Sequence, residues 1–175
     1  MVIAMSEVVA VEFESPNGEA LRVEWPAEAL SEPTGAGAGD RPWRLEGEID
    51  WDEVEALRVL GAGLGDGRAV ALAALRPAGA AGHGDELVAG VLVSDGEVEE
   101  LAETLLSTEY GPDGLPRRVG LELYRPDDPV PLRVAADVQE AWAGRDRGLK
   151  DLRAALTVRR DGKVATGTFE ILTPA

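Results

Sequence analysis

Apolar and polar side chains alternate along much of the chain, and this period of two predicts β-strands. Residues 9–13 and residues 21–25 each alternate in this way. Successive side chains of a strand point to opposite faces, so the alternation places one apolar face toward a core. The segment between them contains Ser15-Pro16-Asn17-Gly18, and Pro followed by Asn-Gly is typical of a turn. The pattern therefore predicts a β-hairpin within residues 1–25.

Residues 26–42 are rich in Gly, Ala and Pro, and we expect a flexible connection there. The alternation returns at residues 43–51, which we predict to be an amphipathic strand with Trp43 and Trp51 on its apolar side. Residues 52–60 fit either a short helix that begins at a capping Asp or a continuation of the strand. The sequence leaves both alternatives open.

The rest of the chain repeats short apolar segments separated by turn residues, with a polar, irregular stretch expected at residues 139–150. The predicted strands are residues 68–75, 87–93, 98–110, 119–124, 132–136, 152–158 and 164–172. Turns such as Ser94-Asp95-Gly96 join neighbouring strands. We expect a mainly all-β single domain over residues 1–175. Its main part, residues 43–172, would be an antiparallel β-barrel or a strongly curved meander sheet, with at most one or two short helices.

Charge and composition narrow the function classes. The chain has 33 acidic and 17 basic side chains, a net charge of −16. Such an acidic body argues against nucleic acid as a partner. No apolar run approaches the roughly 20 residues of a membrane helix, so we expect no membrane partner and a soluble, cytoplasmic protein. The chain has no Cys and a single His, so we also expect no metal site and no cofactor.

Acid–base candidates are few, and the sequence identifies no catalytic set. His83 lies two residues before Asp85, a spacing that suits a general base with its orienting group or an exposed loop histidine without a role. Glu109 and Tyr110 are the other weak candidates. The glycine-rich segment 61–67 has no Walker lysine, so we interpret it as a connection between strands.

Aromatic side chains are scarce, and the candidates for ligand binding come from this small group. They are Trp43, Trp51, Tyr124 and Trp142. Indole and phenol groups can line an apolar cavity and stack on a ligand, or they can fill the interior of a β domain. Filling of the core is the simpler interpretation for the tryptophans.

Four segments resemble the AttH-like, carotenoid-hydratase-like lipocalin superfamily. They are Gly65-Asp66-Gly67-Arg68 with the strand that follows, Gly90 to Glu97, Thr108 to Arg118, and Val164 to Glu170. The resemblance implies a lipocalin-like β-barrel and, in some members, hydration or isomerisation of apolar isoprenoid or polyketide substrates. Members have two such barrels, whereas this chain is long enough for one. The chain also has Ala56-Leu57-Arg58-Val59-Leu60-Gly61 in place of the family's Arg-Asp-His-Ser-Trp-Gly type of motif.

Two functions remain open from the sequence. The first is a small β-barrel that binds an apolar small molecule, with or without a hydratase- or isomerase-like activity. The second is a non-catalytic protein-interaction module or homodimeric structural β domain, and a half-length relative would pair with itself or with a second chain. A wide cavity with a polar cluster would favour the first function, and a filled interior would favour the second.

Overall fold

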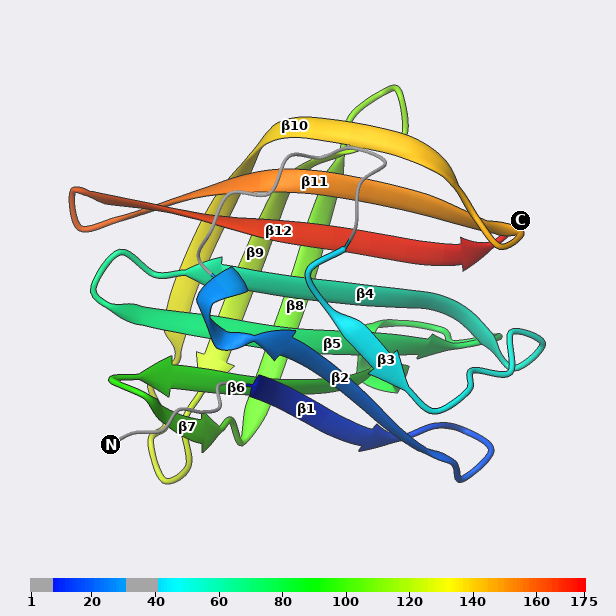
Figure 1. Cartoon of the computed structure of the whole chain (residues 1–175), viewed down its shortest axis with the longest axis horizontal. Helices are drawn as coiled ribbons and strands as arrows, with labels where there is room; N and C mark the ends of the chain where they lie inside the picture. The colour runs from blue at the N-terminus through cyan, green and yellow to red at the C-terminus, as the bar shows by residue number, and fades with distance from the viewer. Residues whose placement is uncertain (1–7, 31–40) are drawn as a thin grey trace.

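The computed structural model describes residues 8–30 and 41–175, and this part of the chain forms two antiparallel sheets (Figure 1). The small sheet has the order β1-β2-β3 and the large sheet the order β7-β6-β5-β4-β12-β11-β10-β9-β8. The strands are β1 (Val8–Glu14), β2 (Ala20–Pro26), β3 (Arg44–Glu46), β4 (Val54–Gly63), β5 (Arg68–Pro77), β6 (Leu87–Ser94), β7 (Glu97–Glu100), β8 (Glu103–Tyr110), β9 (Pro116–Tyr124), β10 (Leu132–Asp146), β11 (Leu149–Arg160) and β12 (Lys163–Pro174). The helical elements within these residues are two single 3-10 turns, η1 (Ala27–Ala29) and η2 (His83–Asp85).

The large sheet curls over itself into a half-barrel. In Figure 1, β8 and β9 pass steeply behind β4, β5 and β6, and the long strand β10 runs from the rear layer to the front. The register of β10 against β11 shifts between Val138 and Glu140, and such a bulge bends a strand and increases its twist. This confirms the predicted fold class: an all-β, antiparallel and strongly curved sheet with only short helices in the described residues.

The small sheet covers the outer face of the large sheet, so the molecule has three layers (Figure 1). The middle layer is therefore buried on both faces. Along β5, Leu72 belongs to the inner core of the half-barrel, whereas the neighbouring Ala73 belongs to the outer core under the small sheet. Burial on both faces explains why β5 is a continuous apolar run and does not alternate.

The N-terminal hairpin is present as β1 and β2, but the strand predicted at residues 43–51 is wrong in extent. Only β3, residues 44–46, pairs with β2. The strand ends at Gly47, whose φ is +103° and whose Cβ would lie 2.8 Å from the carbonyl oxygen of Ala20 if it had one. Trp43 and Trp51 still face the outer core, so the apolar side was correctly identified.

The irregular stretch predicted at residues 139–150 is also wrong. Its residues complete β10, make a turn at Arg147 and Gly148 with positive φ, and begin β11. Residues 139–146 of β10 include no buried side chain, so they show no apolar alternation. Of the alternatives at residues 52–60, the strand is found, as β4. The predicted connection at residues 26–42 lies for its greater part, residues 31–40, outside the described residues.

Truncation of Trp25 in the outer core should test the attachment of the small sheet. Its side chain is 1% exposed, so Trp25→Ala should lower the free energy of unfolding by about 3–5 kcal/mol. Urea denaturation followed by circular dichroism measures this. Val8→Ala, on the same sheet but 57% exposed, is the control and should change stability by less than about 0.5 kcal/mol. Equal losses in the two variants would contradict the three-layer packing.

Candidate functional site

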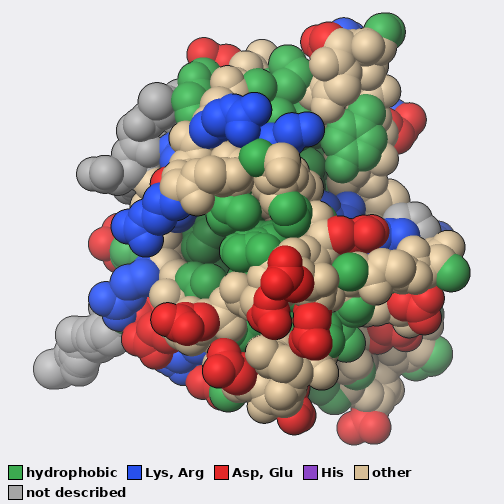
Figure 2. All heavy atoms as spheres, turned by 90° about the vertical axis from the view of Figure 1, so that its right-hand side faces the viewer, with side chains coloured by type: hydrophobic (Ala, Val, Ile, Leu, Met, Phe, Trp, Pro, Cys, Tyr) green, Lys and Arg blue, Asp and Glu red, His purple; other side chains and the backbone are tan. Residues whose placement is uncertain are grey.

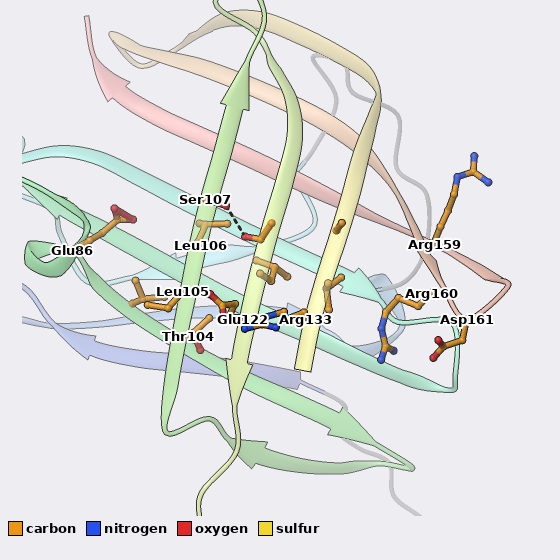
Figure 3. Close-up of a pocket in the computed structure, with 15 residues that line it drawn as sticks. Glu86, Thr104, Leu105, Leu106, Ser107, Glu122, Arg133, Arg159, Arg160 and Asp161 are labelled. Atoms are coloured by element: carbon orange, nitrogen blue, oxygen red, sulfur yellow. Dashed lines mark hydrogen bonds and ion pairs between the residues drawn. The ribbon is translucent and has the colours of Figure 1, made fainter. Parts of the chain in front are cut away.

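A pocket of about 800 Å³ lies on the concave side of the large sheet (Figure 3). Strands β8, β9 and β10 form one wall, and the side chains that point inward from these strands include Leu106, Leu121 and Val134. On the face that Figure 2 presents, the surface is hollowed at its centre, with hydrophobic side chains inside and charged side chains around it. The volume is within the range typical of small-molecule sites.

The inner core of the half-barrel is aliphatic apart from one aromatic side chain. The inner core contains four alanines, Ala62, Ala74, Ala136 and Ala154, and its only aromatic member among the described residues is Phe169. Interiors of proteins are normally packed as densely as organic crystals. In the half-barrel, the space beside Leu106, Leu121 and Val134 is not filled by side chains of the described residues.

A polar cluster lies at one end of the pocket. Arg58 points inward from β4 and is only 8% exposed. Its guanidinium donates a hydrogen bond to Thr108 Oγ1 of β8 at 3.0 Å and another to Glu86 Oε1. Glu86 lines the pocket with a side chain that is 3% exposed. The cluster thus connects β4 of the middle layer to β8 of the rear layer through charge-assisted hydrogen bonds.

The opposite end of the pocket lies at the β11–β12 turn, where Figure 3 shows Arg160 and Asp161. Arg160 donates a hydrogen bond to the carbonyl oxygen of Leu64 at 3.3 Å and pairs with Asp66 at 3.4 Å. Asp66 also accepts a hydrogen bond from Arg68, which lowers the pKa of the Asp66 carboxyl far below its usual value. These interactions fix the turn at this end of the pocket.

A second charged cluster lies on the outer face of β11 and β12. Asp151 is fully buried, and Glu170 is 4% exposed. Arg41 donates to Glu170 Oε2 at 2.7 Å and to Asp151 Oδ2 at 3.3 Å, and its Nη2 lies 2.8 Å from Asp146 Oδ2. Trp43 Nε1 donates to Glu170 Oε1 at 2.9 Å. The cluster attaches the segment before β3 to the large sheet.

Burial raises the pKa of Glu170 to about 7, and the neighbouring Asp151 carboxyl adds to the rise. The hydrogen bond from Arg41 acts in the opposite direction but does not compensate fully. Arg153 Nη2 lies 3.0 Å from Asp151 Oδ2, so the guanidinium groups of Arg41 and Arg153 both face the carboxyl pair. A buried pair of carboxyls of this kind retains a proton that an exposed pair would lose.

The four candidates for ligand binding are not among the residues that line the pocket. Trp43 is buried in the outer core, and Trp51 packs against that core. Trp142 is half-buried beside Arg153, whose guanidinium carbon lies 5.4 Å from the centre of its ring. Tyr124 is half-buried and follows the inward-facing Leu123, so it lies on the outer face of β9.

The three acid–base candidates are not brought together with the pocket. Glu109 is exposed, and Tyr110 is 52% exposed, both near the end of β8. Neither lines the pocket. The backbone of His83 begins η2, and its side chain lies outside the described part of the chain.

Sequence reasoning missed Arg58, Glu86, Asp151 and Glu170. For two of them a signal is present, because Arg58 and Glu170 interrupt otherwise apolar strand segments. A charged residue inside an apolar segment is costly to bury unless it is paired. The sequence could therefore have marked these two positions, but not their partners.

No protein-family model matches the chain, and no curated protein matches it. Within residues 8–30 and 41–175, no helix is long and apolar enough to cross a membrane. The same residues contain no group of three or more His, Asp or Glu side chains arranged to hold a metal ion. We therefore infer the function from the geometry of the pocket and of the two charged clusters.

The raised pKa of Glu170 predicts a pH dependence of stability. Below about pH 4.5 the carboxyl is protonated in both the folded and the unfolded chain. As the pH rises from 4.5 to 7, the unfolded chain releases this proton first, so the folded state loses stability across that window. Glu170→Gln should therefore reduce the loss of stability between pH 5 and pH 7.5, as measured by urea unfolding.

Glu48→Gln removes one negative charge at an exposed position and controls for the change in net charge. Its pH profile should follow that of the wild-type protein. A Glu170→Gln profile with the same slope as the Glu48→Gln profile would show that Glu170 does not retain a proton in the folded protein.

Proposed function

We propose that the protein binds a small, mainly apolar molecule between the two layers of its curled sheet. The pocket of about 800 Å³ is the observation that carries this proposal. A ligand that fills it would remove apolar surface of both partners from water, at about 25 cal/mol per Å². Concave, largely apolar sites with a few buried polar groups are the usual form of a small-molecule site.

The arrangement of the side chains supports binding in the interior. Aliphatic residues from three strands converge on one space, and the buried charged residues lie at its end. The resemblance to the AttH-like, carotenoid-hydratase-like lipocalin superfamily favours the same class of function, since lipocalin-like barrels hold apolar molecules inside. A hydratase- or isomerase-like activity would need a group that faces the pocket, and Glu109 and Tyr110 are exposed outside it.

Filling the pocket should abolish or weaken binding of an apolar probe. We expect the wild-type protein to bind N-phenyl-1-naphthylamine saturably, with one site per chain, as measured by its fluorescence. Val134 is 4% exposed and lines the pocket, so Val134→Phe should occupy part of the space. The affinity should fall by about tenfold, the size of effect that one or two methylene groups have in an apolar pocket.

Val164→Phe is the matched control, because Val164 is 60% exposed on β12 and does not line the pocket. It should leave the affinity within about twofold of the wild-type value, a small effect on the free-energy scale of binding. Absence of saturable binding to the wild-type protein, or equal weakening by both substitutions, would overturn the proposed function.

A second candidate function, self-association through the sheet edges, is favoured by the exposed apolar residues on the two edge strands. Val98 on β7 is 50% exposed, and Leu105 and Tyr110 on β8 are 41% and 52% exposed. Strands β7 and β8 are the ends of the large sheet, and unpaired edges can add a strand from another chain. The occupant of this edge would be a second copy of the chain.

Sedimentation equilibrium tests this alternative. A dimer that Val98→Lys on edge strand β7 dissociates, and that Val164→Lys leaves intact, would support edge pairing; Val164 is 60% exposed and lies on β12, which is not an edge strand. A wild-type protein that remains monomeric at high concentration would exclude it.

A further inference from the structure

The carboxylate of Glu86 has one oxygen engaged and one oxygen without a hydrogen bond. Oε1 accepts a hydrogen bond from Arg58, which in turn is held by Thr108. Oε2 is buried, and no donor in the described residues forms a hydrogen bond with it. A buried acceptor without a donor is destabilising, and such groups in folded proteins usually have a functional reason.

Arg76 is a second cation near Glu86, and it is engaged elsewhere. Arg76 Nη1 lies 3.9 Å from Glu86 Oε2, too far for a hydrogen bond. Arg76 instead donates to the carbonyl oxygen of Ala80 at 3.0 Å and pairs with Glu55. The free oxygen of Glu86 therefore remains available to a donor that does not belong to the protein.

The position of Glu86 relates this oxygen to the pocket. Glu86 precedes β6 and is one of the lining residues, at the end opposite Arg160 and Asp161 (Figure 3). Its side chain turns toward β8 in this view. The wall beyond it includes the aliphatic side chains of Leu106, Leu121 and Val134, and Glu86 is the one buried carboxylate among the lining residues of the described chain.

We propose that the ligand of the pocket is an apolar alcohol whose hydroxyl group donates a hydrogen bond to Glu86. This inference rests on the proposed function and specifies the ligand class. Two guanidinium groups, those of Arg58 and Arg76, lie near the carboxylate and disfavour a cationic ligand. The free carboxylate oxygen disfavours an anionic ligand, because like charges repel strongly where little water is present. An uncharged donor satisfies Glu86 without adding charge.

Displacement of N-phenyl-1-naphthylamine by four matched compounds tests the inference. The compounds are decan-1-ol, decyl methyl ether, decylamine and decanoic acid. The alcohol and the ether differ mainly in the ability to donate a hydrogen bond. We expect the wild-type protein to bind the alcohol at least about tenfold more tightly than the ether, as a hydrogen bond to a charged group requires. The amine and the acid should bind more weakly than the alcohol.

Glu86→Gln should reduce the preference for the alcohol over the ether to within about twofold, because an uncharged amide replaces the carboxylate. Glu99→Gln is the matched control: Glu99 is also paired with an arginine, Arg125, but does not line the pocket. It should retain the wild-type preference. If Glu86→Gln does not fold, as judged by circular dichroism, the ranking of the four compounds on the wild-type protein decides the question alone.

Each outcome separates this inference from the proposed function. Equal binding of alcohol and ether, or tighter binding of the amine or the acid, would overturn the alcohol assignment and leave the apolar pocket as a binding site. The same holds if Glu86→Gln folds and keeps the full preference for the alcohol. Failure of the probe and of all four compounds to bind would overturn both.

Discussion

The structure depends on the burial of the middle layer on both faces. Strands β4 and β5 pack their inward side chains against the half-barrel core and their outward side chains against β1, β2 and β3. Leu60 and Val59 are adjacent in sequence and lie in different cores, each no more than 2% exposed. Because hydrophobic burial is the main favourable term in folding, the small sheet must remain attached for the large sheet to be stable.

The two cores differ in how well they are filled. Trp25 and Trp43 occupy the outer core, whereas the inner one holds aliphatic side chains and Phe169. The half-barrel leaves a pocket of about 800 Å³ beside the inner core, and Glu86 of the Arg58–Glu86–Thr108 bridge lines it. Buried ion pairs rarely add stability over apolar contacts, and the proposed ligand hydroxyl would give this bridge a role in binding.

The charged cluster on the outer face has a structural consequence of its own. Arg41 and Trp43 contact Glu170 and Asp151, and these contacts join the start of the β3 segment to β11 and β12, far away in sequence. Three carboxyls face two guanidinium groups there, and burial of Glu170, with a smaller contribution from the Asp151 carboxyl, accounts for the retained proton. The attachment of the outer layer is therefore sensitive to pH, while the pocket lies on the other face of the same strands.

The sequence by itself determined the β-class, the hairpin turns and the apolar side of most strands, because alternation and Asn-Gly or Asp-Gly turns are local properties. It failed at residues 43–51, where the close approach of Gly47 to Ala20 ends the strand, and at residues 139–150, where a long strand has no buried side chain that would mark an apolar face. Trp43 was correctly assigned to an apolar face, but local alternation carries no information on which layer covers that face.

Only the tertiary structure decided that the large side chains fill the outer core and leave the inner one open, and only it paired Arg58 with Glu86 and Arg41 with Glu170. These contacts join residues 28 and 129 positions apart, and they form because the sheet curls and a third layer covers it.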